Sequence, residues 1–170
     1  MLHFLPLEAF IADLVSGNTL LCHKLFPDMC YLASLRKGLR VLVVDSDLDS
    51  CELLATLFAE YAVETTTAIS ATEALEMIQH TQPDILISEI ILPDENGYWL
   101  IRKVKTFERT SRVRIPAIAL TVCVEHSERI QALTAGFCRH LAKPLNINEL
   151  IATMASITGH PQEMSANTHW

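Results

Sequence analysis

Hydrophobic positions in the middle of the chain follow two alternating patterns. Residues 39–45, LRVLVVD, form a nearly continuous β-branched run, which is typical of a parallel strand covered on both faces. Between such runs, apolar residues recur at helical spacing, as at Leu53, Leu54, Leu57 and Phe58. Strands are predicted at residues 39–45, 63–69, 84–89, 115–121 and 138–142.

Short polar motifs mark where some of the helices begin. Ser70 with Glu73, and Asn146 with Glu149, have the spacing of capping boxes and predict two helix starts. A third helix is predicted at about residues 97–106, after an Asn-Gly turn. Because parallel neighbouring strands need a crossover, five strands alternating with helices predict an α/β fold with a doubly wound, five-stranded parallel sheet and five surrounding helices.

The chain divides into three parts by composition. Residues 38–158 carry the alternating pattern and are predicted to form one domain, and residues 159–170 are a polar tail. Residues 1–37 form an apolar extension that we expect to be helical and to pack on the domain, with a dimerisation or partner-docking element as the alternative. Five apolar residues of the extension can share one helical face: Phe4, Leu7, Phe10, Ile11 and Leu14.

Composition and charge narrow the classes of function. Half of the residues are hydrophobic and 19% are charged, which predicts one well-buried core. The net charge of −7 and the lack of a basic cluster along the sequence argue against nucleic acid as a partner. Charged residues interrupt the amino-terminal apolar segment, and no Lys or Arg precedes Lys24, so we expect neither a membrane span nor a secretory signal. Five scattered cysteines suit a reducing compartment, and we expect a cytoplasmic protein.

Polar side chains stand where several of the predicted strands end. Asp45, Glu89 and Thr121 each close a strand, and Lys143 follows the last one. The carboxyl ends of parallel strands meet at one edge of the sheet, where ligands and chemistry collect. We therefore expect a small acidic pocket with a hydroxyl and an ammonium group.

Five ordered segments carry a family resemblance: Val43-Val44-Asp45, Pro83-Asp84-Ile85-Leu86-Ile87, Leu92-Pro93 with Gly97-Tyr98, Ala119-Leu120-Thr121, and Ala142-Lys143-Pro144-Leu145. With them, residues 39–157 resemble the receiver domain of two-component response regulators. The resemblance implies a flavodoxin-like sheet and phosphoryl transfer from a histidine kinase to an aspartate that ends the third strand. It also implies Mg²⁺ held by acids after the first strand, and threonine and lysine positions that grip the phosphoryl group.

This sequence keeps part of the family's site and departs from the rest. Asp45, Thr121 and Lys143 match the family in residue type. The phosphoacceptor position holds Glu89 in place of aspartate, and Ser46 stands where a second acid is expected. Because misplacing an attacking oxygen by about 1 Å costs on the order of a hundredfold in rate, we expect little or no phosphorylation of Glu89.

Two further positions complete the predicted site. Asp47 is displaced by one residue from the expected second acid, and it either substitutes for that acid in part or caps the first helix of the domain. His140 stands where the family has a Tyr or Phe, and we interpret it as a surface or half-buried imidazole whose hydrogen bonds are satisfied, instead of a metal ligand or pH sensor. We expect no cofactor, and any Mg²⁺ held by Asp45 and Glu89 to bind weakly.

These departures leave several hypotheses open. Glu89 and Lys143 form either a static ion pair or an active-like imitation of the phosphorylated state. The favoured function is a non-enzymatic receiver that binds a histidine kinase, another signalling protein or a second copy of itself, largely without phosphate. The resemblance places such contacts on residues 125–134 and 146–154. The alternatives are a weak but genuine phosphoacceptor, and a flavodoxin-like small-ligand binder or enzyme.

Overall fold

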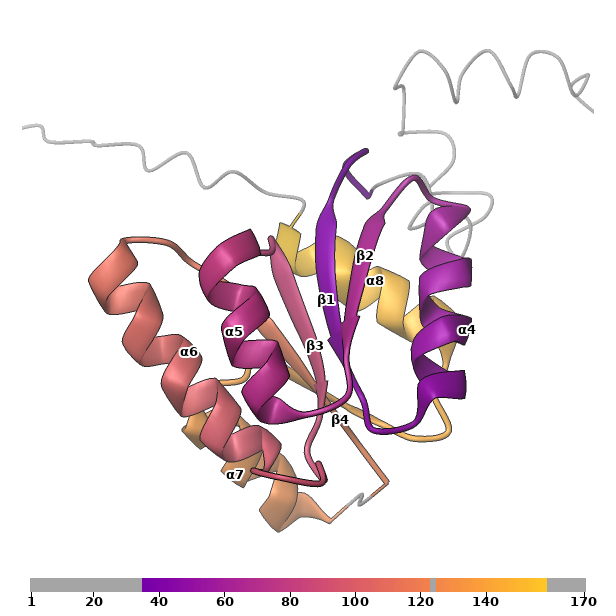
Figure 1. Cartoon of the computed structure of the whole chain (residues 1–170). Coiled ribbons are helices and arrows are strands. Elements are labelled where there is room, and N and C mark those ends of the chain that lie inside the picture. Colours follow the sequence, from indigo (N-terminus) through magenta and orange to yellow (C-terminus); the bar gives the residue numbers. More distant parts are fainter. Residues whose placement is uncertain (1–34, 123–124, 159–170) are drawn as a thin grey trace, which may run out of the picture.

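The computed structural model describes residues 35–122 and 125–158, which fold as strands and helices in strict alternation. Figure 1 shows the sheet with helices packed on both sides of it. The helices in this part of the chain are labelled from α4. The elements are β1 (Arg40–Val44), α4 (Leu48–Ala59), β2 (Glu64–Ala68), α5 (Ala71–Thr81), β3 (Ile85–Glu89), α6 (Gly97–Ser111), β4 (Ala117–Thr121), α7 (His126–Ala135), β5 (Arg139–Ala142) and α8 (Ile147–Thr158).

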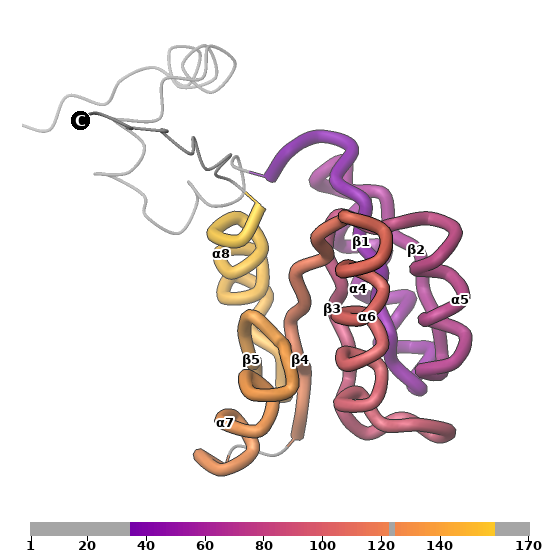
Figure 2. Tube along the Cα trace, turned by 90° about the vertical axis from the view of Figure 1, so that its left-hand side faces the viewer, coloured from indigo at the N-terminus to yellow at the C-terminus, as the bar shows by residue number. Residues whose placement is uncertain are grey.

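The five strands form one parallel sheet in the order β2-β1-β3-β4-β5. Figure 2, turned by 90° from Figure 1, shows this order with β5 and β4 on the left and β1 and β2 on the right. The predicted α/β, doubly wound sheet is therefore confirmed. All residues of β3 and β4 are buried, whereas three of the five residues of β2 are exposed because β2 lies at the edge.

Side chains of the sheet alternate between two hydrophobic cores, as the pleat of a strand requires. Val41 and Val43 point to the core beneath α4 and α8, while Leu42 and Val44 point to the core beneath α5, α6 and α7. Phe58 of α4 is fully buried in the first of these cores. The two helical layers thus cover both faces of the sheet, and the polar residues lie at the strand ends beyond these cores.

Polar side chains cap the helices where the sequence predicted it. The Ser70 hydroxyl accepts a hydrogen bond from the amide of Glu73, and the Asn146 side chain accepts one from the amide of Glu149. The helix predicted at residues 97–106 is longer than expected and ends at Ser111. The apolar stripe of this helix continues through Phe107, which packs against the core. The helix ends where the backbone of Arg112, its C-cap, adopts a left-handed conformation.

The predictions for residues 1–34 and 159–170, which include most of the helical extension and the polar tail, lie outside the described residues. Within residues 35–122 and 125–158, none of the helices has the length and apolarity needed to cross a membrane.

Candidate functional site

Lys143 lies between two buried carboxylates at the carboxyl edge of the sheet, the lower edge in Figure 1. Its Nζ is 2.7 Å from Oδ2 of Asp45 and also pairs with Oε2 of Glu89. The side chains of Asp45 and Glu89 are only 3% and 7% exposed, and that of Lys143 is 24% exposed. The predicted acids and lysine thus lie together, and one ammonium group is shared by two carboxylates.

Both carboxylate oxygens of Glu89 have partners within the fold. Oε1 accepts hydrogen bonds from the amides of Ile90, at 3.0 Å, and Ile91, at 3.4 Å, and Oε2 pairs with Lys143. The glutamate side chain is therefore folded back onto the loop that follows its own strand. In this position its charge is stabilised by the lysine, which it shares with Asp45, and by two backbone N–H groups.

Gly97, at the start of α6, lets this helix approach the end of β3 closely. A Cβ atom at this position would lie 2.7 Å from the carbonyl oxygen of Glu89 and 2.9 Å from Cα of Ile90. The amide of Gly97 also donates a hydrogen bond to the carbonyl oxygen of Ile90. A residue with a side chain would push α6 away, so the glycine sets the position of the loop that holds Glu89.

The two acids that follow β1, Asp45 and Asp47, bond to different parts of the structure. Asp45 bonds Lys143 through Oδ2 and accepts the amide of Asp47 through Oδ1. Asp47 is the N-cap of α4, one of its two predicted roles, and accepts hydrogen bonds from the Ser50 hydroxyl and the Asp49 amide. The Ser50 bond lowers the pKa of Asp47. Ser46, between the two acids, is exposed.

Thr121 ends β4 at the same edge of the sheet as the ion pair, whereas His140 lies on β5 opposite Ala119. Thr121 is 1% exposed, and its carbonyl oxygen accepts the amide of Lys143 at 2.7 Å, which anchors the lysine backbone. His140 is half-buried, as expected, but its buried Nε2 has no hydrogen-bond partner among the described residues. A hydrogen bond of the imidazole is therefore not found at this nitrogen in the described part of the chain.

The pKa of Lys143 reflects its position between the acids. Desolvation works to lower this pKa, but the hydrogen bonds to Asp45 and Glu89 outweigh it, so the pKa is raised above 10.5. Lys143 is consequently fully charged at neutral pH. Both the static and the active-like interpretations of Glu89 predict a contact with Lys143. The observed contact therefore does not distinguish between them.

Asp94 is a structural residue of this edge that the sequence did not reveal. It lies in the loop after β3, and its carboxylate accepts the amides of Ala71 and Thr72 and the Thr72 hydroxyl, at 2.6–3.0 Å. Desolvation opposes its ionisation, but these hydrogen bonds hold the pKa of Asp94 well below its usual range. Asp94 thereby ties the loop that follows Glu89 to the start of α5. Its partners lie more than twenty residues away, so no local motif could identify them.

Comparison with known proteins agrees with this geometry. The family model described as the response regulator receiver domain matches residues 41–155, which is well over half of the chain. The chain belongs to the receiver-domain family. The receiver fold and its place in two-component signalling are thus shown, and the matched region contains every predicted site residue.

Relatives and solved structures of receivers resemble this chain over about two thirds of its length. An uncharacterized 14.6 kDa protein of Leptolyngbya boryana is 35% identical over 65% of this chain and 83% of its own length. The response regulator PleD of Caulobacter vibrioides is 36% identical over 70% of this chain but only 26% of PleD. The crystal structure of a two-component response regulator from Clostridium difficile is 29% identical, with a TM-score of 0.64, over 69% of this chain and 93% of that one. The receiver is thus one part of some longer relatives.

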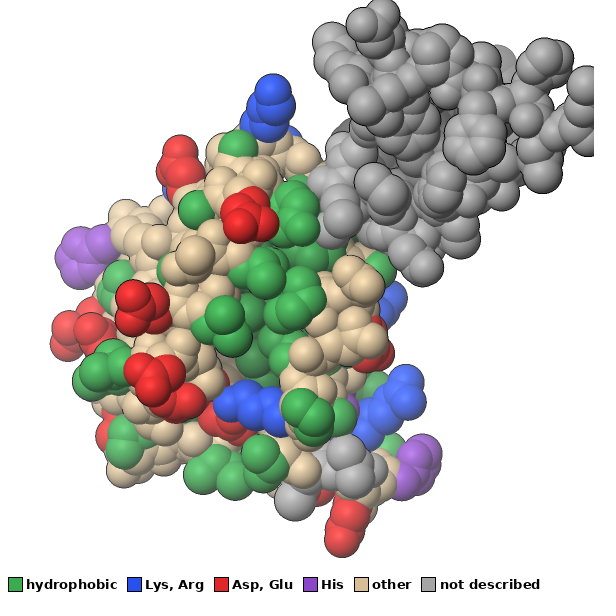
Figure 3. Space-filling model, turned by 90° about the vertical axis from the view of Figure 1, so that its right-hand side faces the viewer, with side chains coloured by type: hydrophobic (Ala, Val, Ile, Leu, Met, Phe, Trp, Pro, Cys, Tyr) green, Lys and Arg blue, Asp and Glu red, His purple; other side chains and the backbone are tan. Residues whose placement is uncertain are grey.

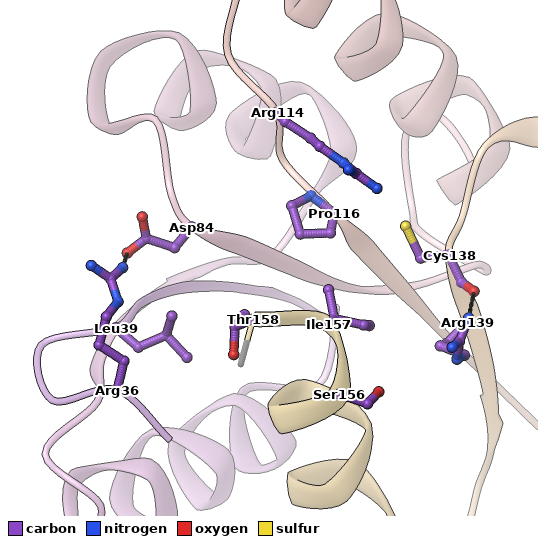
Figure 4. A pocket seen from close by; sticks show the side chains of 10 residues that line it. All are labelled: Arg36, Leu39, Asp84, Arg114, Pro116, Cys138, Arg139, Ser156, Ile157 and Thr158. Atoms are coloured by element: carbon purple, nitrogen blue, oxygen red, sulfur yellow. Dashed lines mark hydrogen bonds and ion pairs between the residues drawn. The ribbon is translucent and has the colours of Figure 1, made fainter. Parts of the chain in front are cut away.

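A cavity of about 700 Å³ lies at the opposite, amino-terminal edge of the receiver sheet. Figure 4 shows Arg36 bonded to Asp84 on one side of it, with Arg114 and Arg139 across the opening. These arginines are far apart in the sequence, so the fold gathers basic residues where the sequence showed no cluster. The cavity contains none of the strand-end residues, and the ion pairs at the carboxyl edge are the better candidate for the receiver's functional site.

Proposed function

We propose that this receiver acts as a phosphate-independent interaction module and is not an enzyme. The observation that carries the proposal is the state of the Glu89 carboxylate, whose two oxygens are paired with Lys143 and with the amides of Ile90 and Ile91. An attacking oxygen would have to leave these partners before it could reach a phosphodonor. The extra methylene group of glutamate also displaces the carboxylate from where an aspartate would present it.

We also propose that Mg²⁺ does not bind this site tightly. The residues present fit the ion poorly, because Mg²⁺ needs near-octahedral oxygen coordination and uses carboxylates as its protein ligands. Asp45 and Glu89 already share Lys143, and Asp47 holds the first turn of α4 through Ser50 and Asp49. The position of the usual second acid is occupied by Ser46.

Exposed apolar residues on α7 support the proposal that this helix contacts a partner protein. Ile130 is 52% exposed and Leu133 is 43% exposed, within the region 125–134 where receivers are expected to make contacts. Isolated exposed aliphatic residues are common on protein surfaces, whereas neighbouring ones on a helix favour a protein partner. We propose a histidine kinase or another signalling protein as the partner, with a second copy of the chain as the alternative.

The test is incubation of the full chain with Mg²⁺ and a small-molecule phosphodonor, followed by intact-mass measurement. We expect no phosphoryl adduct on the wild-type chain. A stable adduct that is lost in Glu89→Ala but retained in a control variant, Glu95→Ala, would instead establish Glu89 as a genuine phosphoacceptor. Glu95 is an exposed acid of the following loop and serves as the matched control.

A further inference from the structure

The cavity at the amino-terminal edge of the sheet carries more positive than negative charge. Three of its described lining residues are arginines: Arg36, Arg114 and Arg139. Asp84 is the one acid among the described lining residues, and it pairs with Arg36 at 2.9 Å and with Arg40 at 3.2 Å. Two arginines therefore already compensate this acid, and Arg114 and Arg139 have no acidic partner in the described part of the chain.

These two arginines offer hydrogen-bond donors to the cavity. The side chain of Arg114 is exposed and makes no hydrogen bond or ion pair with another described residue. Arg139 donates to the carbonyl oxygen of Cys138, at 2.8 Å, through Nη1 alone. A guanidinium group has five N–H donors in a planar fork that fits phosphate and carboxylate groups. Figure 4 shows both side chains across the cavity from the pair of Arg36 and Asp84.

The other walls of the cavity are mostly apolar or already bonded. Leu39 is 1% exposed, and Pro116 and Ile157 are partly buried. The hydroxyl groups of Ser156 and Thr158 donate to backbone carbonyl oxygens within α8, so neither has a hydrogen left for a ligand. A cavity of about 700 Å³ is within the size range of small-molecule sites. Apolar walls with a few cationic groups suit an organic anion better than a bare inorganic ion.

Helix ends do not explain these two arginines. The helices of a parallel sheet end at its amino-terminal edge, where cations stabilise the negative ends of the helix dipoles. Arg109, in the last turn of α6, fits that explanation. Arg114 instead lies between α6 and β4, and Arg139 begins β5. Neither side chain donates a hydrogen bond to a helix-terminal carbonyl among the described residues.

The positive charge at this edge contrasts with the rest of the chain, whose net charge is −7. Helix α4 carries Asp49 and Glu52 and no Lys or Arg. Figure 3 shows a side of the molecule on which carboxylates spread over the left part. An anion that approaches this protein is therefore favoured at the arginines of the cavity over the acidic surfaces.

We propose that this cavity binds a small organic anion, with Arg114 and Arg139 holding its phosphate or carboxylate group and the apolar walls contacting the rest of the molecule. The site lies at the opposite edge of the sheet from Glu89 and Lys143, so binding there requires neither phosphoryl transfer nor Mg²⁺. The inference is independent of the proposed function, and either can fail without the other.

The test titrates the isotopically labelled full chain with phenyl phosphate and, in a second arm, with benzoate, while NMR spectra record the amide resonances. We expect a Kd below about 1 mM for at least one probe, with shifts at Cys138, Arg139 and residues 156–158. The tighter probe identifies the anionic group, and either result supports the proposal. Inorganic phosphate should bind about tenfold more weakly than phenyl phosphate, because it has no apolar body to bury.

Substitutions then test the two arginines. Arg114→Gln and Arg139→Gln should each weaken binding of the tighter probe about tenfold, because each removes a charged hydrogen-bond donor. Arg102→Gln removes the same charge from an exposed position on α6 that is not among the described lining residues, and should keep the wild-type Kd. The NMR spectrum of each variant also shows whether its domain is folded.

Four results would overturn the proposal. They are a Kd above about 1 mM for both probes, an unchanged Kd in both cavity variants, and an equal loss in Arg102→Gln. The fourth is a set of shifts confined to Asp45, Glu89 and Lys143, which would place the anion at the functional site. Binding of a DNA duplex or of anionic lipid vesicles that is lost in the cavity variants, while neither small probe binds, would also contradict it, because the arginines would then serve a macromolecular polyanion.

Discussion

Replacing Lys143 by methionine removes the only cation in contact with the two buried acids in the described structure. Lys143→Met keeps the length of the side chain but leaves Asp45 and Glu89 without their shared charge partner. Each acid keeps backbone partners, the amide of Asp47 for the first and those of Ile90 and Ile91 for the second. Breaking a buried pair costs about 3–5 kcal/mol, and these remaining bonds favour the lower end, about 3 kcal/mol. For a chain of this size that is a fall in Tm of about 6–12 °C.

The assay is urea unfolding of the wild type, Lys143→Met and the control Lys37→Met at pH 7. Lys37 is exposed, so its replacement should change the free energy of unfolding by less than about 0.5 kcal/mol. A loss at Lys143→Met no larger than at the control would refute the reasoning, because the lysine would then contribute nothing to the pairing.

The pH dependence provides a second check on Lys143. Its pKa is raised above 10.5 in the folded protein, so the stability that it contributes is fully present below pH 10.5. That contribution is lost as the pH rises through the folded pKa. The difference in unfolding free energy between the wild type and Lys143→Met should therefore be constant from pH 7 to about 10 and shrink above it. A constant difference up to the alkaline limit of folding would contradict the ion pairing.

Two further substitutions test the loop that holds Glu89. Asp94→Ala should lower the free energy of unfolding by about 1–2 kcal/mol, and Glu95→Ala by much less. Because the pKa of Asp94 is depressed well below 3.8, the deficit is full above pH 3.8 and shrinks progressively as the pH falls from there toward the pKa of the folded state, and a deficit that does not shrink at all below pH 3.8 would contradict this assignment. Gly97→Ala should cost about 3 kcal/mol, since its Cβ meets backbone atoms, whereas Gly38→Ala, with φ of +71° and open space around it, should cost about 1 kcal/mol. Equal costs in thermal unfolding would show that the close approach of α6 to the Glu89 carbonyl is unimportant.

The sequence predicts the sheet well because its central strands are unambiguous. The runs at residues 39–45 and 84–89 are short, nearly continuous in apolar residues and rich in β-branched ones, which is typical of a strand covered on both sides. The ends of these strands also place Asp45 and Glu89 at one edge, which the structure confirms. The end of α6 is harder to predict from the sequence. Phe107 continues the apolar stripe of the helix, but only its packing against the core shows that the chain is still helical there.

Contacts between distant parts of the chain are what the sequence could not provide. The bonds from Asp94 to the first turn of α5 and the gathering of Arg36, Arg114 and Arg139 at one cavity depend on the fold as a whole. The absence of a partner for Nε2 of His140 among the described residues also follows from packing and not from any motif. Local patterns therefore locate the site, and the tertiary structure determines how its charges are paired.

Restoring the two family acids tests the central claim most directly. The measurement is the phosphorylated fraction, by intact mass, of the Ser46→Asp, Glu89→Asp double variant and of the wild type after equal exposure to Mg²⁺ and a small-molecule phosphodonor. We predict an adduct on the double variant and none on the wild type, with rates that differ by about a hundredfold or more. Equal phosphorylation of the two proteins would contradict the account, because Ser46 and Glu89 would then not be what prevents the reaction.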